Sequence, residues 1–422
     1  MFEGQGLFAR HLFNVVAFLI MVLLLSAVPM VDATTFGSPI RITTNMYPSY
    51  DPSVAASGTY VYVAWADYTP VSGSGSNPEI WLRVSSNNGA TFGSPIRIST
   101  NTYLSERPSV AASGSYVYVA WHDATPVSGS GGQPEIWLRA SSNNGASFGS
   151  PIRISTNTGQ SEWPSVAASG SYVYVAWHDS TPVSGSGGNY EVWLRVSSNN
   201  GGSFGSPIRI SANTYPSIVP SVAADGTYVY VAWHDSTPVS GSGGNYEVWL
   251  RVSSSNGASF GPPIRISTNT YGSSYSSVAA YGSYVYVAWE DYTPVSGSGG
   301  SAEIWMRVSS NNGASFGSAI RISYNTYDSR LPSVVAYGTY VYVAWHDSTP
   351  VSGSGTNPEV WMRVSSNNGG TFGSPIRITT NTGQSTMPSV AASGSYVYVA
   401  WQDNTPVSGS GGAFEVWLRA GS

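Results

Sequence analysis

Apolar and polar residues repeat in one pattern every 56 residues from residue 34 to the end of the chain. In the second copy, Tyr116 to Asp123 alternates aromatic with β-branched residues, and Glu135 to Ser141 forms another alternating run. A period of two residues is typical of β-strands. Shorter runs lie at Pro108 to Ser113 and at Pro151 to Ser155, and clusters of Gly, Pro, Ser and Asn separate the four runs. The pattern therefore predicts four strands in each copy.

The second strand of each copy is apolar on both faces. Val119 and Trp121 share one face, whereas Tyr118 and Ala120 share the other. Such a strand is packed on both sides, as in a propeller blade between two neighbours. The first run contains small residues such as Ala111, which suit the innermost strand near a propeller axis.

The two ends of the repeat region complete each other. Thr34 to Asn45 carries only the last strand of a unit, whereas Glu415 to Ser422 is a third strand without a fourth. Pairing the first strand with the last blade gives seven complete blades and removes exposed sheet edges. We therefore expect an all-β fold, a single seven-bladed β-propeller of four-stranded antiparallel blades over residues 34–422. An open solenoid is the alternative, and it would leave two unfinished units exposed.

Composition and charge exclude several kinds of site. The chain has no cysteine, so neither a disulfide framework nor a thiolate ligand or nucleophile is available. Its formal charge is -5, and all 17 basic residues are arginines, 14 of which recur at two fixed positions of the repeat. Fourteen recurring acids balance these arginines, whereas nucleic-acid binding needs a clustered positive surface. We expect no nucleic-acid partner.

Residues 1–33 differ from the repeats. Arg10 and His11 precede an apolar run from Leu12 to Val28, and Ala33 is a small residue at a plausible cleavage point. We expect an export signal peptide. The alternative is an uncleaved N-terminal membrane anchor, because the run approaches the span of about 17–25 residues that a bilayer requires. Either alternative predicts a secreted or cell-surface protein, with membrane contact only through this segment.

A recurring turn lies between the third and fourth strands. It has the pattern Ser-x-Asn-x-Gly-x-Ser/Thr-Phe, begins at Ser85 in the first copy, and occurs six times, with Ser255 replacing the Asn in the fourth copy. This motif resembles the Asp-box of the bacterial neuraminidase repeat in sialidase-like propellers, with Asn for the usual Asp and Phe for the usual Trp. The Asn side chain can bond nearby amides and the Gly can take a positive φ, so its expected role is structural.

The resemblance implies a particular catalytic set in the true sialidases: an arginine triad, a tyrosine nucleophile with a glutamate partner, and an acidic proton donor. Those are unique residues on a six-bladed ring. In this chain, arginines such as Arg83 and Arg97 recur in every copy, and Pro39-Ile40-Arg41-Ile42 runs into Thr43 instead of forming the early Phe/Tyr-Arg-Ile-Pro element. The catalytic set does not map onto this sequence, and a sialidase activity would rest on fold analogy.

Differences among the copies concentrate in the long loops and blade-to-blade crossings, which alternating strand direction brings to one face. The crossings and the residue after the recurring Trp supply the candidate binding residues, namely Asp51, Glu106, Arg107, His122, Glu162, Trp163, His178, His234, Glu290, Asp328, Arg330 and His346. An acidic face with aromatic residues suits a sugar, a peptide or a cation. The alternative is that exposed loops vary freely.

Two recurring sets of polar residues have structural interpretations. In His-Asp pairs such as His122 and Asp123, adjacent strand residues point to opposite faces, so we expect no metal site, and the Asp is expected to cap the next turn. Glu79 and Arg83 flank a Trp on the third strand of the first copy. We expect these recurring pairs to form interblade ion pairs and hydrogen bonds rather than a substrate-binding ring of carboxylates.

These features favour a non-catalytic propeller that binds a glycan or an extracellular protein through its long-loop face, without a cofactor. One alternative is a sialidase-like glycoside hydrolase, which needs two carboxylates about 5–10 Å apart. Its plausible suppliers are Glu106, Glu162, Glu290 and Asp328. A second alternative is a structural component of a surface lattice.

Overall fold

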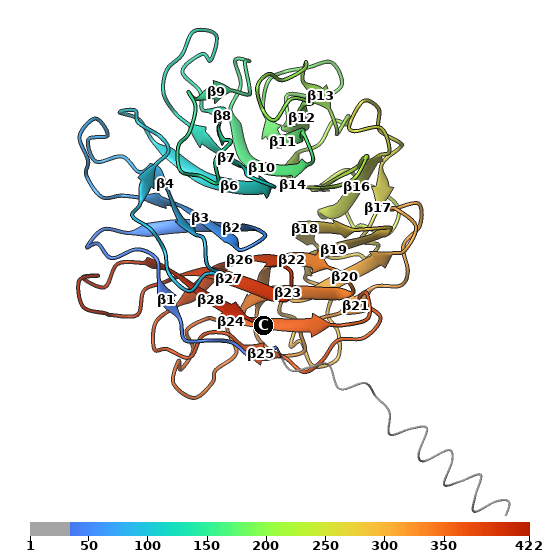
Figure 1. Cartoon of the computed structure of the whole chain (residues 1–422). Helices are drawn as coiled ribbons and strands as arrows, with labels where there is room; N and C mark the ends of the chain where they lie inside the picture. The colour runs from blue at the N-terminus through green and yellow to red at the C-terminus, as the bar shows by residue number, and fades with distance from the viewer. Residues whose placement is uncertain (1–33) are drawn as a thin grey trace, which may run out of the picture. The chain divides into compact units, whose positions relative to one another are not determined.

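The repeat region folds as a seven-bladed β-propeller. A computed structural model describes residues 34–422, of which Phe36 to Ser422 form one compact unit. Seven antiparallel sheets of four strands each surround a central axis (Figure 1). The predicted fold class and number of blades are confirmed.

Equivalent strands have equivalent bounds in all blades. The innermost strands are β2 (Ser49–Ser57), β6 (Ser105–Ser113), β10 (Ser161–Ser169), β14 (Ser217–Asp225), β18 (Ser273–Tyr281), β22 (Ser329–Tyr337) and β26 (Ser385–Ser393). The second strands are β3 (Tyr60–Asp67), β7 (Tyr116–Asp123), β11 (Tyr172–Asp179), β15 (Tyr228–Asp235), β19 (Tyr284–Asp291), β23 (Tyr340–Asp347) and β27 (Tyr396–Asp403).

The outer half of each blade consists of a long and a short strand. The third strands are β4 (Glu79–Ser85), β8 (Glu135–Ser141), β12 (Glu191–Ser197), β16 (Glu247–Ser253), β20 (Glu303–Ser309), β24 (Glu359–Ser365) and β28 (Glu415–Gly421). The fourth strands are β5 (Ile96–Arg97), β9 (Ile152–Arg153), β13 (Ile208–Arg209), β17 (Ile264–Arg265), β21 (Ile320–Arg321), β25 (Ile376–Arg377) and β1 (Ile40–Arg41).

The second strands form the centre of the core. In β7 every residue from Val117 to Ala120 is fully buried, and Trp121 is 2% exposed. Residues from the two faces belong to two different hydrophobic clusters, because each face packs against a different neighbouring blade. Burial on both sides, predicted from the apolar character of both faces, is confirmed.

The inner and outer strands differ in length from the prediction. The inner strand of the second blade starts at Ser105 and not at Pro108, because Ser105 and Glu106 pair with β7 before a bulge interrupts the ladder. Arg107 lies in that bulge with a positive φ of 54°. The fourth strand is shorter than predicted, since only Ile152 and Arg153 pair with β8.

The chain ends close the ring. Strand β1 pairs antiparallel with β28, so the first described strand completes the last blade (Figure 1, blue beside red). Arg41 donates to the buried Glu415 carboxylate at 2.6 Å, and the backbone N–H of Ile42 donates to the Val416 carbonyl at 2.8 Å. The predicted closure is confirmed, and the open solenoid is excluded for the described residues.

The recurring ion pair joins different residues from those expected. Glu79 does not pair with Arg83 but with Arg97 of the fourth strand, at 2.5 Å, and it also accepts a hydrogen bond from Ser99. Strand pairing explains this partner choice, because Trp81 of β4 is in register with Arg97. Arg83 instead donates to the Ile42 carbonyl of the preceding blade at 2.7 Å. The expected interblade hydrogen bonds are present, but the expectation of interblade ion pairs is wrong, because this ion pair joins the third and fourth strands of one blade.

The Ser-x-Asn-x-Gly-x-Ser/Thr-Phe segments form tight turns. The Asn87 side-chain oxygen accepts hydrogen bonds from Ser85 at 2.8 Å and from the Thr91 N–H at 3.0 Å. Both Asn88 and Gly89 have positive φ values, which Asn and Gly tolerate best. The predicted structural role is confirmed, although the sequence analysis assigned a positive φ only to the glycine.

The predicted signal or anchor at residues 1–33 lies outside the described residues. From residue 34 onward, no helix is long and apolar enough to cross a membrane.

Candidate functional site

Two kinds of connection lie at opposite ends of the strands. At one end the recurring Asn-Gly turn meets the hairpin of the inner strands, since the Asn88 N–H donates to the Thr59 carbonyl at 2.8 Å. At the other end the long loop after the second strand meets the blade-to-blade crossing, since the Ser105 N–H donates to the Pro78 carbonyl at 3.1 Å. This second end is the long-loop face that the sequence analysis predicted.

An axial channel runs between the inner strands and has a cavity of about 250 Å³. Its wall contains a Pro-Ser pair from almost every blade, such as Pro108 and Ser109. Each of these serines accepts a hydrogen bond from the next blade, as Ser109 does from the Val166 N–H at 3.0 Å. The Pro-Ser pairs therefore join neighbouring blades around the axis.

The rim of the channel on the long-loop face consists of the second and third residues of each inner strand. All third residues have φ between 48° and 55° although none is glycine. They are Asp51, Arg107, Trp163, Val219, Tyr275, Leu331 and Met387. A left-handed backbone is unfavourable for such side chains, above all for the β-branched Val219. The bulge nevertheless presents one variable side chain from every blade at the channel mouth.

In four blades the residue after the recurring Trp supports this bulge in the next blade, namely His178, His234, Glu290 and Gln402. His178 accepts from the Val219 N–H at 3.1 Å, and Glu290 accepts from the Leu331 N–H at 3.1 Å. In the blade that closes the ring, Gln402 accepts from the Asp51 N–H at 3.0 Å. These side chains lie in strands beneath the rim and are buried, whereas the sequence analysis placed them among the exposed loops. Their hydrogen bonds therefore hold the backbone of the rim in place.

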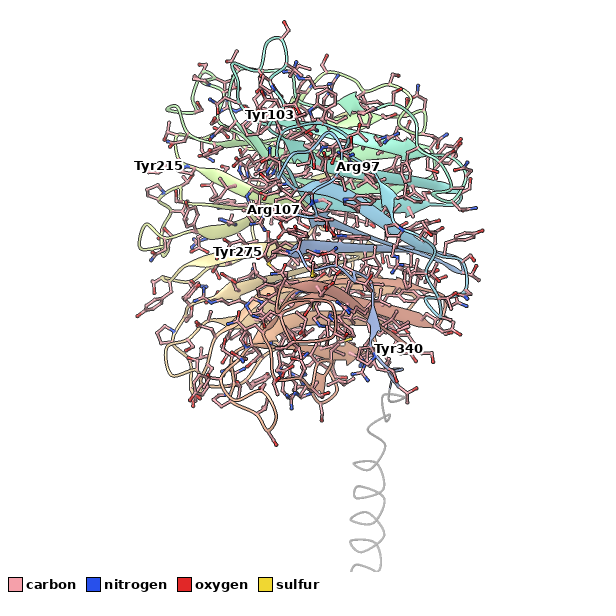
Figure 2. All side chains as sticks on the ribbon, turned by 90° about the vertical axis from the view of Figure 1, so that its left-hand side faces the viewer. Arg97, Tyr103, Arg107, Tyr215, Tyr275 and Tyr340 are labelled. Atoms are coloured by element: carbon pink, nitrogen blue, oxygen red, sulfur yellow. The ribbon has the colours of Figure 1, made fainter. Side chains whose placement is uncertain are left out.

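The first rim cluster joins blades 1 to 3. Arg107 donates to Asp51 at 2.9 Å, and its guanidinium carbon lies 4.1 Å from the centroid of the Trp163 ring. Tyr275 of the fifth blade continues this platform, with its ring centroid 6.2 Å from that of Trp163 (Arg107 and Tyr275 are labelled in Figure 2). Arginine stacked on tryptophan gains a favourable cation–π contact. A cationic and aromatic platform therefore covers one side of the channel mouth.

Acidic side chains surround this platform. The Tyr68 hydroxyl donates to Glu106 at 2.5 Å, and His122 lies 4.0 Å from the same carboxylate. His178 lies 3.8 Å from Glu162 in the equivalent arrangement of the third blade. The cluster thus holds three carboxylates, counting Asp51, around a single arginine.

Burial changes the protonation behaviour of the cluster. It raises the pKa of the Asp51 carboxyl to about 6, against the lowering effect of Arg107, and the nearby Glu106 raises it further. Burial also lowers the pKa of the His122 ring. Burial and the hydrogen bond to Glu106 raise the pKa of the Tyr68 hydroxyl, which keeps this hydroxyl protonated at neutral pH.

A second rim cluster lies at blades 5 and 6. Arg330 pairs with Asp328 at 2.9 Å and lies over the Tyr292 ring at 5.5 Å. Glu290 accepts from Ser274 at 3.0 Å, and burial raises its pKa. This cluster has no tryptophan, and both members of its ion pair are substantially exposed.

The structure brings most of the predicted residues to the rim in these two groups. Two further predicted histidines are neutral at pH 7, because burial lowers the pKa of His234 to about 3 and that of His346 to about 4. His346 lies opposite Arg330 of the second cluster, and the His234 ring contacts the Tyr275 ring. Tyr68 and Tyr275 are not among the predicted binding residues. The signal was present, because the position after the recurring Asp and the third position of the inner strand both vary from copy to copy.

Among residues 34–422, no three or more His, Asp or Glu side chains are grouped so that they could hold a metal ion.

One family model matches parts of this chain. A family model described as the LVIVD repeat matches residues 51–69, 108–125, 163–180, 272–293 and 386–405. These ranges lie on the two innermost strands of five blades and include Asp51, Trp163 and Tyr275 of the rim. The LVIVD repeat is a different repeat family from the neuraminidase repeat that the turn motif resembles. Among curated proteins, none has a sequence that matches this chain.

Solved structures with a similar fold are sialidases and related enzymes. Phage phi92 endosialidase has a TM-score of 0.50 at 9% identity, over 92% of this chain and 69% of that chain. A Trypanosoma rangeli sialidase mutant displaying trans-sialidase activity has a TM-score of 0.49 at 12% identity, over 92% of this chain. This chain spans 60% of the length of that mutant. At such identities the likeness concerns the propeller fold.

Proposed function

We propose that this protein is a secreted or cell-surface, non-catalytic propeller that binds a glycan through the first rim cluster. The observation that carries the proposal is the platform of Arg107, Trp163 and Tyr275 at the mouth of a channel, with carboxylates beside it. Aromatic rings offer flat apolar faces to the C–H face of a sugar, and charged groups hydrogen-bond its hydroxyls. The export pattern of residues 1–33 supports a location outside the cytoplasm.

The rim favours a glycan over a protein partner because the platform is small and partly buried, with the Arg107 side chain 32% exposed. Small polar ligands bind in concave sites with a few convergent polar groups. A stable protein interface buries roughly 800 Å² on each partner. A protein partner remains the alternative outcome of the test.

The test is a glycan array probed with the wild-type protein and with Trp163→Ala. We expect Trp163→Ala to weaken binding of the selected glycan at least tenfold, because the stacking surface is lost. Met387→Ala is the matched control, since Met387 occupies the same bulge position in the last blade. It should change the affinity less than twofold. If no glycan on the array binds, and if the wild-type protein captures an extracellular protein that Trp163→Ala does not capture, the ligand of the rim is a protein and not a glycan.

A sialidase-like hydrolase is the second candidate, and one observation favours it. The Tyr68–Glu106 hydrogen bond lies beside Asp51, whose pKa of about 6 suits a proton donor. Against it, the cluster contains one arginine where the sialidase pattern has three, and the raised pKa of Tyr68 disfavours a nucleophile. Turnover of a fluorogenic sialoside that Glu106→Gln abolishes would establish this activity.

We also propose that the recurring Asn-Gly turns are Asp-box turns with Asn in the place of Asp. The hydrogen bonds of Asn87 to Ser85 and to the Thr91 N–H support this, since a carboxylate at position 87 could accept both. Asn87→Asp should therefore leave the melting temperature within about 2 °C of wild type.

A further inference from the structure

The first rim cluster carries more negative than positive charge. Asp51, Glu106 and Glu162 supply three carboxylates, whereas Arg107 supplies the single guanidinium of the cluster. Arg107 is paired with Asp51 at 2.9 Å, and the chain has no lysine. Within residues 34–422, the carboxylates of Glu106 and Glu162 therefore have no arginine or lysine within ion-pair distance.

Both of these carboxylates are accessible to a ligand. The side chain of Glu106 is 24% exposed and that of Glu162 is 29% exposed. In the chain they directly precede the two stacked residues of the platform, Arg107 and Trp163. The contact with His178 holds the pKa of the Glu162 carboxyl below its ordinary value, so this group is ionised at neutral pH. A ligand on the platform therefore meets negative charge that the protein does not compensate.

His122 lies beside the same two carboxylates and is neutral at pH 7. Burial lowers the pKa of its ring, and this effect is larger than the opposing electrostatic effects of Glu162 and Glu106. The side chain is only 9% exposed and its Nδ1 is enclosed, so Nε2 is the ring nitrogen that a ligand can reach. Nε2 lies 4.0 Å from the Glu106 carboxylate, which is too far for a hydrogen bond, and no other described residue bonds it. A polar atom left without a partner in this position points to a partner from a ligand.

A primary ammonium group fits this arrangement. Its three N–H groups match three acceptors, namely the carboxylates of Glu106 and Glu162 and, with the ring proton on Nδ1, the Nε2 atom of His122. Two hydrogen bonds of about 2.8 Å at the tetrahedral angle reach acceptors about 4.6 Å apart, and the 4.0 Å between Nε2 and Glu106 is close to this separation. A sugar acid would instead meet two groups of its own charge.

We infer that the first rim cluster binds an amino sugar in its protonated form, with the ammonium group on Glu106, Glu162 and His122 and the sugar ring on the Trp163 platform. This inference rests on the proposed glycan-binding function and deepens it by naming the charge and the recognised group of the glycan. Hydrogen bonds between ionised partners are about twice as strong as neutral ones, so the free amine decides which sugar is preferred. An N-acetylated or neutral sugar offers no such group.

The test is calorimetric titration of the whole protein, at about pH 6, with three trisaccharides of the same linkage, built from glucosamine, N-acetylglucosamine or glucose. We expect the glucosamine trisaccharide to bind at least tenfold more tightly than the other two. If either of the other two binds as tightly, or if only a different glycan of the array binds at Trp163, the inference is overturned and the glycan-binding function stands. If no glycan binds at all, the proposed function fails together with the inference.

Variants separate recognition in the cluster from general attraction of a cationic ligand to an acidic protein. Glu106→Gln and Glu162→Gln, made separately, should each weaken binding of the glucosamine trisaccharide at least fivefold, and either variant suffices if the other does not fold. Asp225→Asn is the charge-matched control, because Asp225 ends strand β14 on the opposite face, where it accepts from the Gly282 N–H. It should change the affinity less than twofold. Equal losses in the control and in the two Glu variants would overturn the inference.

Discussion

Asp51 shows how one residue of the rim can set the pH response of the protein. Its carboxyl has a folded pKa of about 6 against an ordinary value of 3.8, because burial outweighs the Arg107 contact. Between these two pH values the folded protein holds a proton that the unfolded chain releases. The associated stability is therefore complete below pH 3.8 and is lost as the pH rises through 6.

Asp51→Asn removes the titrating carboxyl and therefore this pH dependence of the stability. The variant should be more stable than wild type at pH 7 by about 1–3 kcal/mol, and the difference should shrink toward zero near pH 4. Urea unfolding at several pH values between 4 and 7 measures it. Asp328→Asn is the control, because that partly exposed ion pair should contribute less than about 1 kcal/mol. A pH-independent difference for Asp51→Asn would contradict the assignment.

At the scale of the element, the recurring turn can be compared with its own natural variant. In the fourth blade Ser255 replaces the Asn, and the N–H of Ser259 reaches its hydroxyl only at 3.3 Å. The equivalent Asn oxygen in the next blade accepts from Ser315 at 3.0 Å and from Ser309 at 2.8 Å. The shorter Ser side chain thus makes a weaker turn.

Ser255→Asn should restore these bonds and stabilise the protein by about 0.5–1.5 kcal/mol. The mirror substitution Asn311→Ser should destabilise it by a similar amount. Thermal unfolding of both variants provides the measurement. If both substitutions shift the melting temperature in the same direction, the hydrogen bonds of the turn are not the cause.

The elements also show what could be predicted from sequence. Strands such as Tyr116–Asp123 were predicted with the observed bounds, because their alternating pattern is long and bounded by turn residues. The inner strand was predicted three residues short, since the bulge at Arg107 breaks the alternation and the following Pro108 resembles a loop signal. The rim of the candidate site could be predicted, because it contains the positions that vary most among the copies. The contacts between Trp163 and Tyr275 could not be predicted, because they depend on side-chain packing across the channel.

At the scale of the whole molecule, the ring depends on one short strand from the other end of the chain. Deleting residues 34–45 removes the buried Ile42 and the Arg41–Glu415 ion pair, and it exposes the edge of β28. We expect a loss of at least about 2 kcal/mol and self-association through the free edge, measured by urea unfolding and light scattering. A truncated protein that stays monomeric with wild-type stability would contradict this expectation.

A circular permutant is the matched control for this deletion. Phe36 bridges to Gly421, and inserting Asn-Asn-Gly between Ser422 and Thr34 reproduces the length of the recurring turn. With new ends between Gly131 and Gly132 in a long loop, the permutant keeps every strand. It should be monomeric and at least as stable as residues 34–422 in their natural order.

The strand that closes the ring is nearly the same in sequence as six other strands, since Ile-Arg recurs in every blade. An unclosed molecule therefore accepts this strand equally well from itself or from another molecule. Dilution favours the intramolecular partner, whose tether keeps it nearby. Refolding at high concentration should instead produce exchanged dimers and longer chains of linked rings, which dissociate only when the donated strand unfolds.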